Sequence, residues 1–278
     1  MLETPQIPSG VDPEKPAPAR LYDYYLGGTT NFPVDREAAE RIRADLPEIS
    51  DVAWANRGFH QRAASWLAGE RGIRQFIDIG SGLPTQGNTH EVVQNISRQA
   101  RVVYVDNDPM VLAYAKALLT DDGSTAVIRA DLRDPGTVLN DPDLRALIDF
   151  SQPIGLLMSA VLHFVADGSD PWGLVARYVR ALVPGSYLVV SHVTADNVPS
   201  RGVQTGLQVY AQATENIYLR SRAEVERFFE GLEMEAPYQG GAPALAFMGE
   251  WGAEDSELAD SDGSRWGYCG VGRIPGDG

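Results

Sequence analysis

A glycine-rich turn after a buried apolar run is the first feature of this sequence that can do chemistry. The segment FIDIGSGLPT (76–85) places two glycines directly after the apolar residues. Glycine lets a ligand approach the backbone closely because no Cβ intervenes. In an open parallel sheet such a turn lies at the carboxyl ends of the strands, where ligands bind. We therefore predict a ligand site at Gly80, Ser81, Gly82 and Leu83.

The spacing within this turn indicates which ligand is expected. A dinucleotide site favours the pattern G-x-G-x-x-G/A, but Thr85 fills the third small position here. The loop from Gly80 to Asn88 is also too long to aim a helix N-terminus at a pyrophosphate. These departures favour a nucleoside without phosphates. The alternative is that the glycines only form a structural turn.

Two acidic residues follow the next two predicted strands. Asp106 comes about two dozen residues after the glycines, where a carboxylate can accept hydrogen bonds from both ribose hydroxyls. Asp131 follows the third predicted strand, and its carboxylate can accept a hydrogen bond from the exocyclic amine of adenine. Asn107 and Leu132 are expected to contribute through backbone or side chain. Taken singly, each acid also fits a loop or helix-capping role.

The elements that position these residues alternate between strands and helices. Five near-continuous apolar runs predict strands at 73–80, 101–108, 125–131, 153–160 and 186–193, and a last strand covers 266–273. Helices are expected at 35–46, 51–69, 88 onward, 109–119, 135–148, 171–183, 203–213 and 221–231. This order predicts an α/β, Rossmann-like, seven-stranded, mostly parallel sheet with helices on both faces and an antiparallel last strand.

The region before the first strand divides into two parts. Residues 1–20 contain five prolines and are expected to form a mobile arm. Residues 21–72 are expected to form an N-terminal helical cap or lid on the 73–278 core, within one domain.

The motifs of the core resemble class I S-adenosylmethionine-dependent methyltransferases over about residues 73–273. FIDIGSG is similar to their glycine motif, YVDND to the ribose-binding motif and RADLRDP to the adenine-side motif. MSAVLHFV (158–165), which contains Ser159, is similar to the fourth-strand segment that borders the methyl group. The resemblance implies S-adenosyl-L-methionine as cofactor, with S-adenosyl-L-homocysteine as product.

A closer resemblance covers nearly the whole chain. The segment PSGVDPEKPAPARLYDYYLGGTTNFPVDR (8–36) resembles a bacterial family first catalogued as a domain of unknown function and later named S-adenosyl methyltransferase. This resemblance implies the fold and the cofactor but no acceptor. Tyr22 and Tyr25 are expected to border the cofactor, because aromatic faces attract a sulfonium cation. The alternative is that these tyrosines only pack a helix onto the sheet.

The four histidines include one candidate for catalysis. His163 follows the fourth strand, beside the expected methyl position, and can orient or deprotonate an acceptor hydroxyl, or can be a structural loop residue. His192 ends a strand and is expected to be structural, and His60 and His90 lack partners at metal-ligand spacing. We expect no metal. Methyl transfer needs no strong base, because the sulfonium is already an activated leaving group.

Composition limits the partners. The net charge is −15, from 23 basic and 38 acidic residues, which makes nucleic acid and anionic membranes unfavourable partners. Cys269 is the single cysteine, and the N-terminus has neither a signal peptide nor a membrane anchor, so we expect a cytoplasmic protein. A small-molecule acceptor is therefore expected, and the oligomeric state stays open.

Three other functions remain compatible with these residues. They are a nicotinamide-dependent (NAD) oxidoreductase, an aminopropyl transferase, and a non-catalytic protein that binds S-adenosylmethionine or S-adenosylhomocysteine.

Overall fold

The structure, a computed structural model, describes residues 7–85, 87–118 and 123–276. Residues 1–6 of the predicted arm and the helix end predicted at residue 119 lie outside this range. Within it, no helix combines the length and the hydropathy needed to cross a lipid bilayer.

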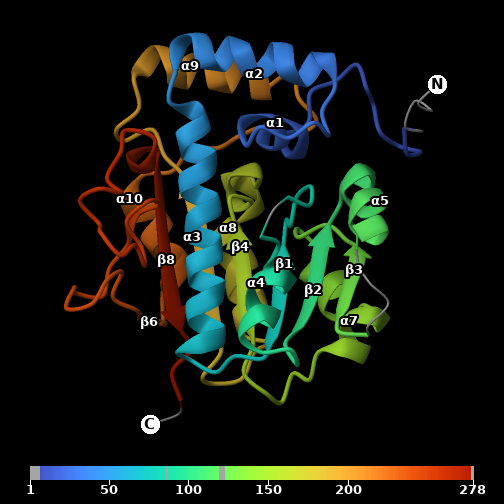
Figure 1. Cartoon of the computed structure of the whole chain (residues 1–278), viewed down its shortest axis with the longest axis vertical. Coiled ribbons are helices and arrows are strands. Elements are labelled where there is room, and N and C mark those ends of the chain that lie inside the picture. Colours follow the sequence, from blue (N-terminus) through green and yellow to red (C-terminus); the bar gives the residue numbers. More distant parts are fainter. Residues whose placement is uncertain (1–6, 86, 119–122, 277–278) are drawn as a thin grey trace.

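A mostly parallel sheet forms the centre of the molecule (Figure 1). Its parallel strands are β1 (Gln75–Ile79), β2 (Arg101–Asp106), β3 (Thr125–Arg129), β4 (Gly155–Ser159) and β5 (Tyr187–Val193). The antiparallel part consists of β8 (Gly267–Arg273), β6 (Glu233–Met234) and β7 (Ala246–Phe247). The strand order is β3-β2-β1-β4-β5-β8-β6, and β7 pairs with β8 outside this path.

The predicted fold class is confirmed. The described sheet has eight strands rather than seven, since both β6 and β7 are two-residue strands beside β8. Strands this short leave no alternating pattern in a sequence, so periodicity cannot locate them.

Helices cover both faces of the sheet, which explains why its strands are apolar throughout. Phe76 of β1 joins a core with α3 on one face, and its neighbour Ile77 joins a second core on the other face. The helices around the sheet are α3 (Ile49–Gly69), α4 (Thr89–Ile96), α5 (Pro109–Leu118), α6 (Pro135–Leu139), α7 (Pro142–Leu147), α8 (Pro171–Val179) and α10 (Arg222–Glu226). Short 3-10 turns are η1 (Leu162–Phe164), η2 (Asp167–Ser169), η3 (Arg227–Phe229) and η4 (Ser264–Trp266).

The helix predicted over 135–148 is two helices. Asp141 caps the second one, because its carboxylate accepts hydrogen bonds from the backbone N–H groups of Asp143 and Leu144. Pro142 at the first helical position supplies no N–H to continue the preceding helix. By contrast, the helix predicted from residue 88 onward is present as α4, and it begins with a capping box in which Asn88 N donates to the Glu91 carboxylate at 2.7 Å.

Three helices lie over the carboxyl ends of the parallel strands: α1 (Pro18–Tyr25), α2 (Pro33–Asp45) and α9 (Ser200–Tyr210) (Figure 1). The boundary predicted at residue 20, between a mobile arm and the cap, falls inside α1. Arg20 is 2% exposed and pairs with the buried carboxylate of Asp35 at 2.7 Å. Asp35 also accepts hydrogen bonds from the backbone of Ala17 and Phe32. Residues 17–20 are therefore fixed against the cap rather than free of it.

Candidate functional site

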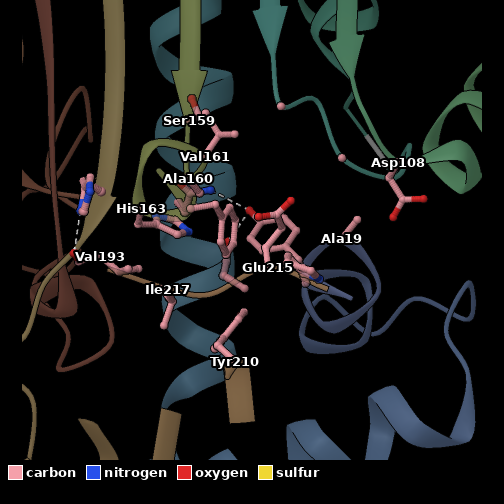
Figure 2. A pocket seen from close by; sticks show the side chains of 18 of the residues that line it. Ala19, Asp108, Ser159, Ala160, Val161, His163, Val193, Tyr210, Glu215 and Ile217 are labelled. Carbon is pink, nitrogen blue, oxygen red and sulfur yellow. Dashed lines mark hydrogen bonds between the residues drawn. The ribbon is translucent and has the colours of Figure 1, made fainter. Parts of the chain in front are cut away.

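A cavity of about 460 Å³ lies between the cap helices and the carboxyl ends of the parallel strands. Its wall includes residues that follow β1, β2, β3, β4 and β5, together with residues of α1, α3 and α9. The size is in the range of sites that hold small molecules. Figure 2 shows this wall from close by.

The two glycines after β1 have different structural reasons. Both have positive φ, +70° at Gly80 and +67° at Gly82. A Cβ on Gly80 would lie 2.2 Å from the side chain of Val161, so packing requires glycine there. A Cβ on Gly82 would meet nothing within 4 Å. Gly82 therefore presents bare backbone to open space at the cavity wall, where a ligand can approach it.

Asp106 lies beside this turn, at the end of β2. Its two carboxylate oxygens accept the backbone N–H groups of Gly82 and Asp108, each at 2.9 Å. Burial raises the pKa of Asp106 to about 6, although these backbone hydrogen bonds oppose the shift. The cavity therefore contains a desolvated carboxylate beside the glycine turn, and ligand hydroxyls that donate to it would stabilise its ionised form.

The next strand end differs from the prediction. Leu132 lines the cavity, but the Asp131 side chain does not. The Asp131 carboxylate instead accepts hydrogen bonds from Arg133 Nε at 2.9 and 3.0 Å, and Arg133 also pairs with Glu215. Partial burial would raise the pKa of Asp131, but the hydrogen bonds from Arg133 outweigh this effect and lower it. Arg133, rather than Asp131, lies at the wall.

Of four other predicted residues, one lies away from the cavity and three line it. Leu83 does not line the cavity, because it packs against Met110 and Val111 in a small apolar cluster. Asn107 does line it, as do Ser81 and Ser159. The turn therefore brings Gly80, Ser81 and Gly82 to the cavity and directs Leu83 into the protein.

Both predicted tyrosines line the cavity from α1. The Tyr22 hydroxyl donates to the backbone oxygen of Ala53 at 3.1 Å and accepts from the Asn56 side chain at 2.9 Å. Burial raises the pKa of both Tyr22 and Tyr25. Both rings therefore stay neutral and tie α1 to the rest of the cap, so packing and cavity lining occur together.

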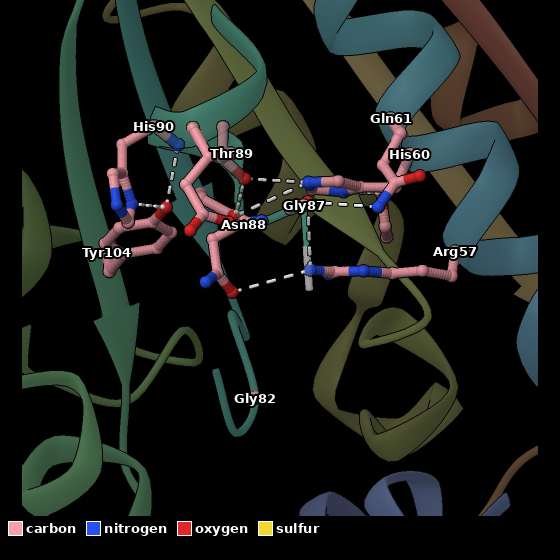
Figure 3. Close-up of polar contacts among 12 residues, drawn as sticks. Arg57, His60, Gln61, Gly82, Gly87, Asn88, Thr89, His90 and Tyr104 are labelled. Carbon is pink, nitrogen blue, oxygen red and sulfur yellow. Dashed lines mark hydrogen bonds and ion pairs between the residues drawn. The ribbon is translucent and has the colours of Figure 1, made fainter. Parts of the chain in front are cut away.

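A chain of hydrogen bonds that the sequence did not reveal crosses from α3 to β1. The Thr89 hydroxyl donates to the Asp78 carboxylate at 2.6 Å and lies 2.7 Å from Nε2 of His60 (Figure 3). Because the threonine proton is committed to Asp78, Nε2 must carry the proton that Thr89 accepts. Nδ1 of His60 then accepts from the Ser159 hydroxyl, 2.9 Å away. Burial lowers the pKa of His60, which is consistent with this neutral tautomer.

This chain leaves Ser159 in a defined state. Its proton points to His60, so only oxygen lone pairs remain for the cavity. Ser159 is therefore a hydrogen-bond acceptor at the end of β4.

His163 lies on η1, in the same wall (Figure 2). Its side chain is not bonded to backbone: Nδ1 is buried and has no partner in the described part of the chain. Burial, with the neighbouring His192 and Arg220, lowers the pKa of His163 well below its usual value. His163 is therefore a neutral imidazole facing the cavity.

His192 has the structural role that was predicted for it. Its Nδ1 donates to the backbone oxygen of Val193 at 2.7 Å, and Arg220 donates to its Nε2 at 2.8 Å. Burial lowers the pKa of His192 to about 3. No group of three or more metal-ligating side chains gathers anywhere in the described ranges.

Comparisons with known proteins agree with this geometry. A family model described as S-adenosyl methyltransferase matches residues 4–275. A solved structure of a candidate methyltransferase from Thermobifida fusca YX is 38% identical, with a TM-score of 0.88, over 98% of this chain and 100% of that one. A DUF574 family protein from Streptomyces avermitilis MA-4680 is 40% identical, with a TM-score of 0.87, over 95% and 99% of the two chains.

More distant structures share only the fold. An O-methyltransferase family protein from Burkholderia thailandensis is 13% identical, with a TM-score of 0.51, over 88% of this chain and 60% of that one. No curated protein matches the sequence. The chain belongs to the S-adenosyl methyltransferase family and is an S-adenosylmethionine-dependent methyltransferase.

Proposed function

We propose that this enzyme transfers the methyl group directly, by in-line displacement, to a small-molecule acceptor. The observation that carries the proposal is that one cavity contains both the Gly82–Asp106 corner and the neutral His163. A cofactor bound at the Gly82–Asp106 corner and an acceptor beside His163 would share the same cavity. Alignment within such a space can supply most of the rate effect, because the bound sulfonium provides an already activated methyl group.

The residues of the wall fit the cofactor. Asp106 would accept the ribose hydroxyls, and the open backbone at Gly80, Ser81 and Gly82 would let the nucleoside approach. Asn107 and Leu132 would border the adenine. Asp131 would act indirectly, by holding the Arg133 side chain in place. Leu83 would support the turn by packing in the apolar cluster beneath it.

Two other contacts concern the amino-acid end and the reacting centre. Ser159, which can only accept, suits the ammonium group of the cofactor. Tyr22 and Tyr25 present neutral aromatic surface to the cavity, which favours a nearby sulfonium. His163 would orient an acceptor hydroxyl and take up its proton.

A small molecule is favoured over nucleic acid as acceptor. The net charge of −15 opposes association with a phosphate backbone. The cavity also lies beneath α1, α2 and α9, which would exclude a polymer segment from the reacting centre.

Two measurements test the proposal. Calorimetry should show that S-adenosylhomocysteine binds and that NAD does not. Protein incubated with methyl-labelled S-adenosylmethionine and a metabolite extract should then move the label to a low-molecular-weight product. Cofactor binding without any labelled small molecule would favour a non-catalytic binder, and label on nucleic acid or protein would refute the acceptor class.

A further inference from the structure

The part of the cavity beneath α2 and α9 differs chemically from the cofactor corner. Five positions of α9 line it at helical spacing: Gly202, Val203, Gly206, Leu207 and Tyr210. They form one stripe, because residues i and i+4 share a helix face. In the described part of the chain, no charged side chain is among the lining residues from α2, α9 or the first turn of α3.

The opposite wall is equally apolar. Ile42 of α2, Leu46 at its end, and Ile49 and Val52 of α3 line the same space. Tyr210 and Ile217 lie on the side of the cavity away from Ser159 (Figure 2). Burial raises the pKa of Tyr210 to about 12, so its hydroxyl is also uncharged. An ionised group placed among these side chains would lose its hydration and find no charged partner among them, which is strongly unfavourable. Glu215, which lines the same cavity, is already paired with Arg133 at 3.0 Å.

Two glycines shape this end of the cavity in different ways. A Cβ on Gly202 would lie 2.1 Å from the Leu46 side chain, so this glycine lets α2 and α9 approach closely. A Cβ on Gly206, one turn later on the stripe, would meet no atom within 4 Å. Gly206 therefore leaves a flat patch of helix backbone beside open space, between Gly202 and Tyr210.

We propose that the methyl acceptor is an uncharged, planar aromatic molecule with a hydroxyl group, held against Gly206 between α2, α3 and α9. This inference rests on the methyl transfer proposed above. The flat patch at Gly206 accommodates a ring, and Tyr210 and Trp266 add aromatic surface to the wall. The acceptor hydroxyl would point to His163, the neutral polar group between this chamber and the cofactor corner.

The transfer balances without any further reactant. The hydroxyl oxygen forms a bond to the methyl carbon while the carbon–sulfur bond breaks, and its electron pair stays on sulfur. The hydroxyl proton passes to the His163 imidazole and from there to solvent. The products are a neutral methyl ether and a neutral thioether, so no net charge builds up in the apolar chamber.

The test compares three probes of similar shape and different charge. Protein saturated with S-adenosylhomocysteine is titrated with 2-naphthol, with 2-naphthoate and with 2-naphthylmethylammonium in a calorimeter. We expect 2-naphthol to bind at least about tenfold more tightly than either ion, because neither ion finds a partner in the chamber. Equal or tighter binding of an ion, or no binding of any probe, would overturn the inference.

A variant pair locates the binding at α9. In Gly206→Leu the new side chain fills the open patch, so affinity for 2-naphthol should fall at least about tenfold while the Kd of S-adenosylhomocysteine changes by less than about twofold. Gln208→Leu adds the same side chain at an exposed position of α9 outside the wall, and both affinities should stay unchanged. Unchanged 2-naphthol binding in Gly206→Leu would contradict the inference.

The two proposals fail in different ways. If the wild-type protein does not bind S-adenosylhomocysteine, the proposed function falls and this inference falls with it. If S-adenosylhomocysteine binds but the probes do not separate by charge, only the acceptor class is wrong.

Discussion

Asp106 offers the sharpest test of the cofactor site. An ionised carboxylate has about four lone-pair positions, of which two accept the N–H groups of Gly82 and Asp108. The remaining two are available for ribose hydroxyls. Asp106→Asn replaces one acceptor oxygen by a donor, so at least one hydrogen bond to the ribose is lost. A hydrogen bond to a charged group contributes about 1.5–3 kcal/mol, which predicts a roughly 10- to 150-fold weaker Kd for S-adenosylhomocysteine.

The pH dependence follows from the same carboxylate. Burial raises the pKa of Asp106 to about 6 in the free protein, and only the ionised form has the lone pairs that the ribose needs. Affinity for S-adenosylhomocysteine should therefore be high at pH 7 and fall as the pH drops through 6, by about tenfold at pH 5. The Asp106→Asn variant cannot titrate, so its weaker binding should be flat over the same interval.

Calorimetric titration at pH 5, 6 and 7 checks both expectations. Asp134→Asn is a suitable control, since Asp134 is an acidic cap of α6 outside the cavity wall and its loss should leave the Kd unchanged. Circular dichroism establishes that each variant is folded. A folded Asp106→Asn protein that binds within about twofold of wild type, or a wild-type affinity independent of pH, would refute the assignment of the ribose to this residue.

Five further substitutions test the packing around the site by urea unfolding. Gly80→Ala should lower the free energy of unfolding more than Gly82→Ala, because its Cβ meets a side chain in addition to the roughly 1 kcal/mol that positive φ costs any alanine; equal losses would contradict this. Arg20→Met should lower the free energy of unfolding by about 3–5 kcal/mol, because it leaves the buried Asp35 carboxylate without its ion-pair partner. Arg133→Met, which removes a partly exposed ion pair, should lower it by only about 0–1 kcal/mol. Thr89→Val should lower the free energy of unfolding by about 1–3 kcal/mol, because the buried His60 imidazole and the Asp78 carboxylate lose their shared hydrogen-bond partner. An unchanged midpoint of urea unfolding would contradict the hydrogen-bond chain from Asp78 through Thr89 to His60.

Local signals in the sequence were enough for the five parallel strands and β8, but not for β6 and β7, and they also marked Gly80, Gly82 and Asp106, which lie together at the cavity. An apolar run followed by glycines, and another followed by Asp106, are patterns of a few residues, and the parallel sheet brings such strand ends together. The same local reasoning did not reveal that the Asp131 carboxylate accepts hydrogen bonds from Arg133. Its orientation is decided by Arg133, which also pairs with Glu215, 82 residues further along the chain.

Long-range pairing also explains what the sequence could not reveal. His60 and Ser159 are hydrogen bonded although 99 residues separate them. His60 has no partner at a regular spacing, so no local pattern marks it. For a related reason the sequence did not show that α1 begins before residue 20, because the proline-rich composition of the N-terminus does not reveal that Arg20 has a buried partner in α2. A buried ion pair between two segments is visible only once both are placed.

The cap over the cavity is not one continuous piece of chain. Helix α2 comes from the N-terminal region and α9 follows β5, yet the two lie together over the sheet, with Gly202 against Leu46. Exchanging the N-terminal region alone between relatives would therefore pair a foreign α2 with the native α9, and the close contact between the two helices would no longer be matched. A chimera meant to change acceptor preference should carry both segments together, because each supplies one side of the same chamber.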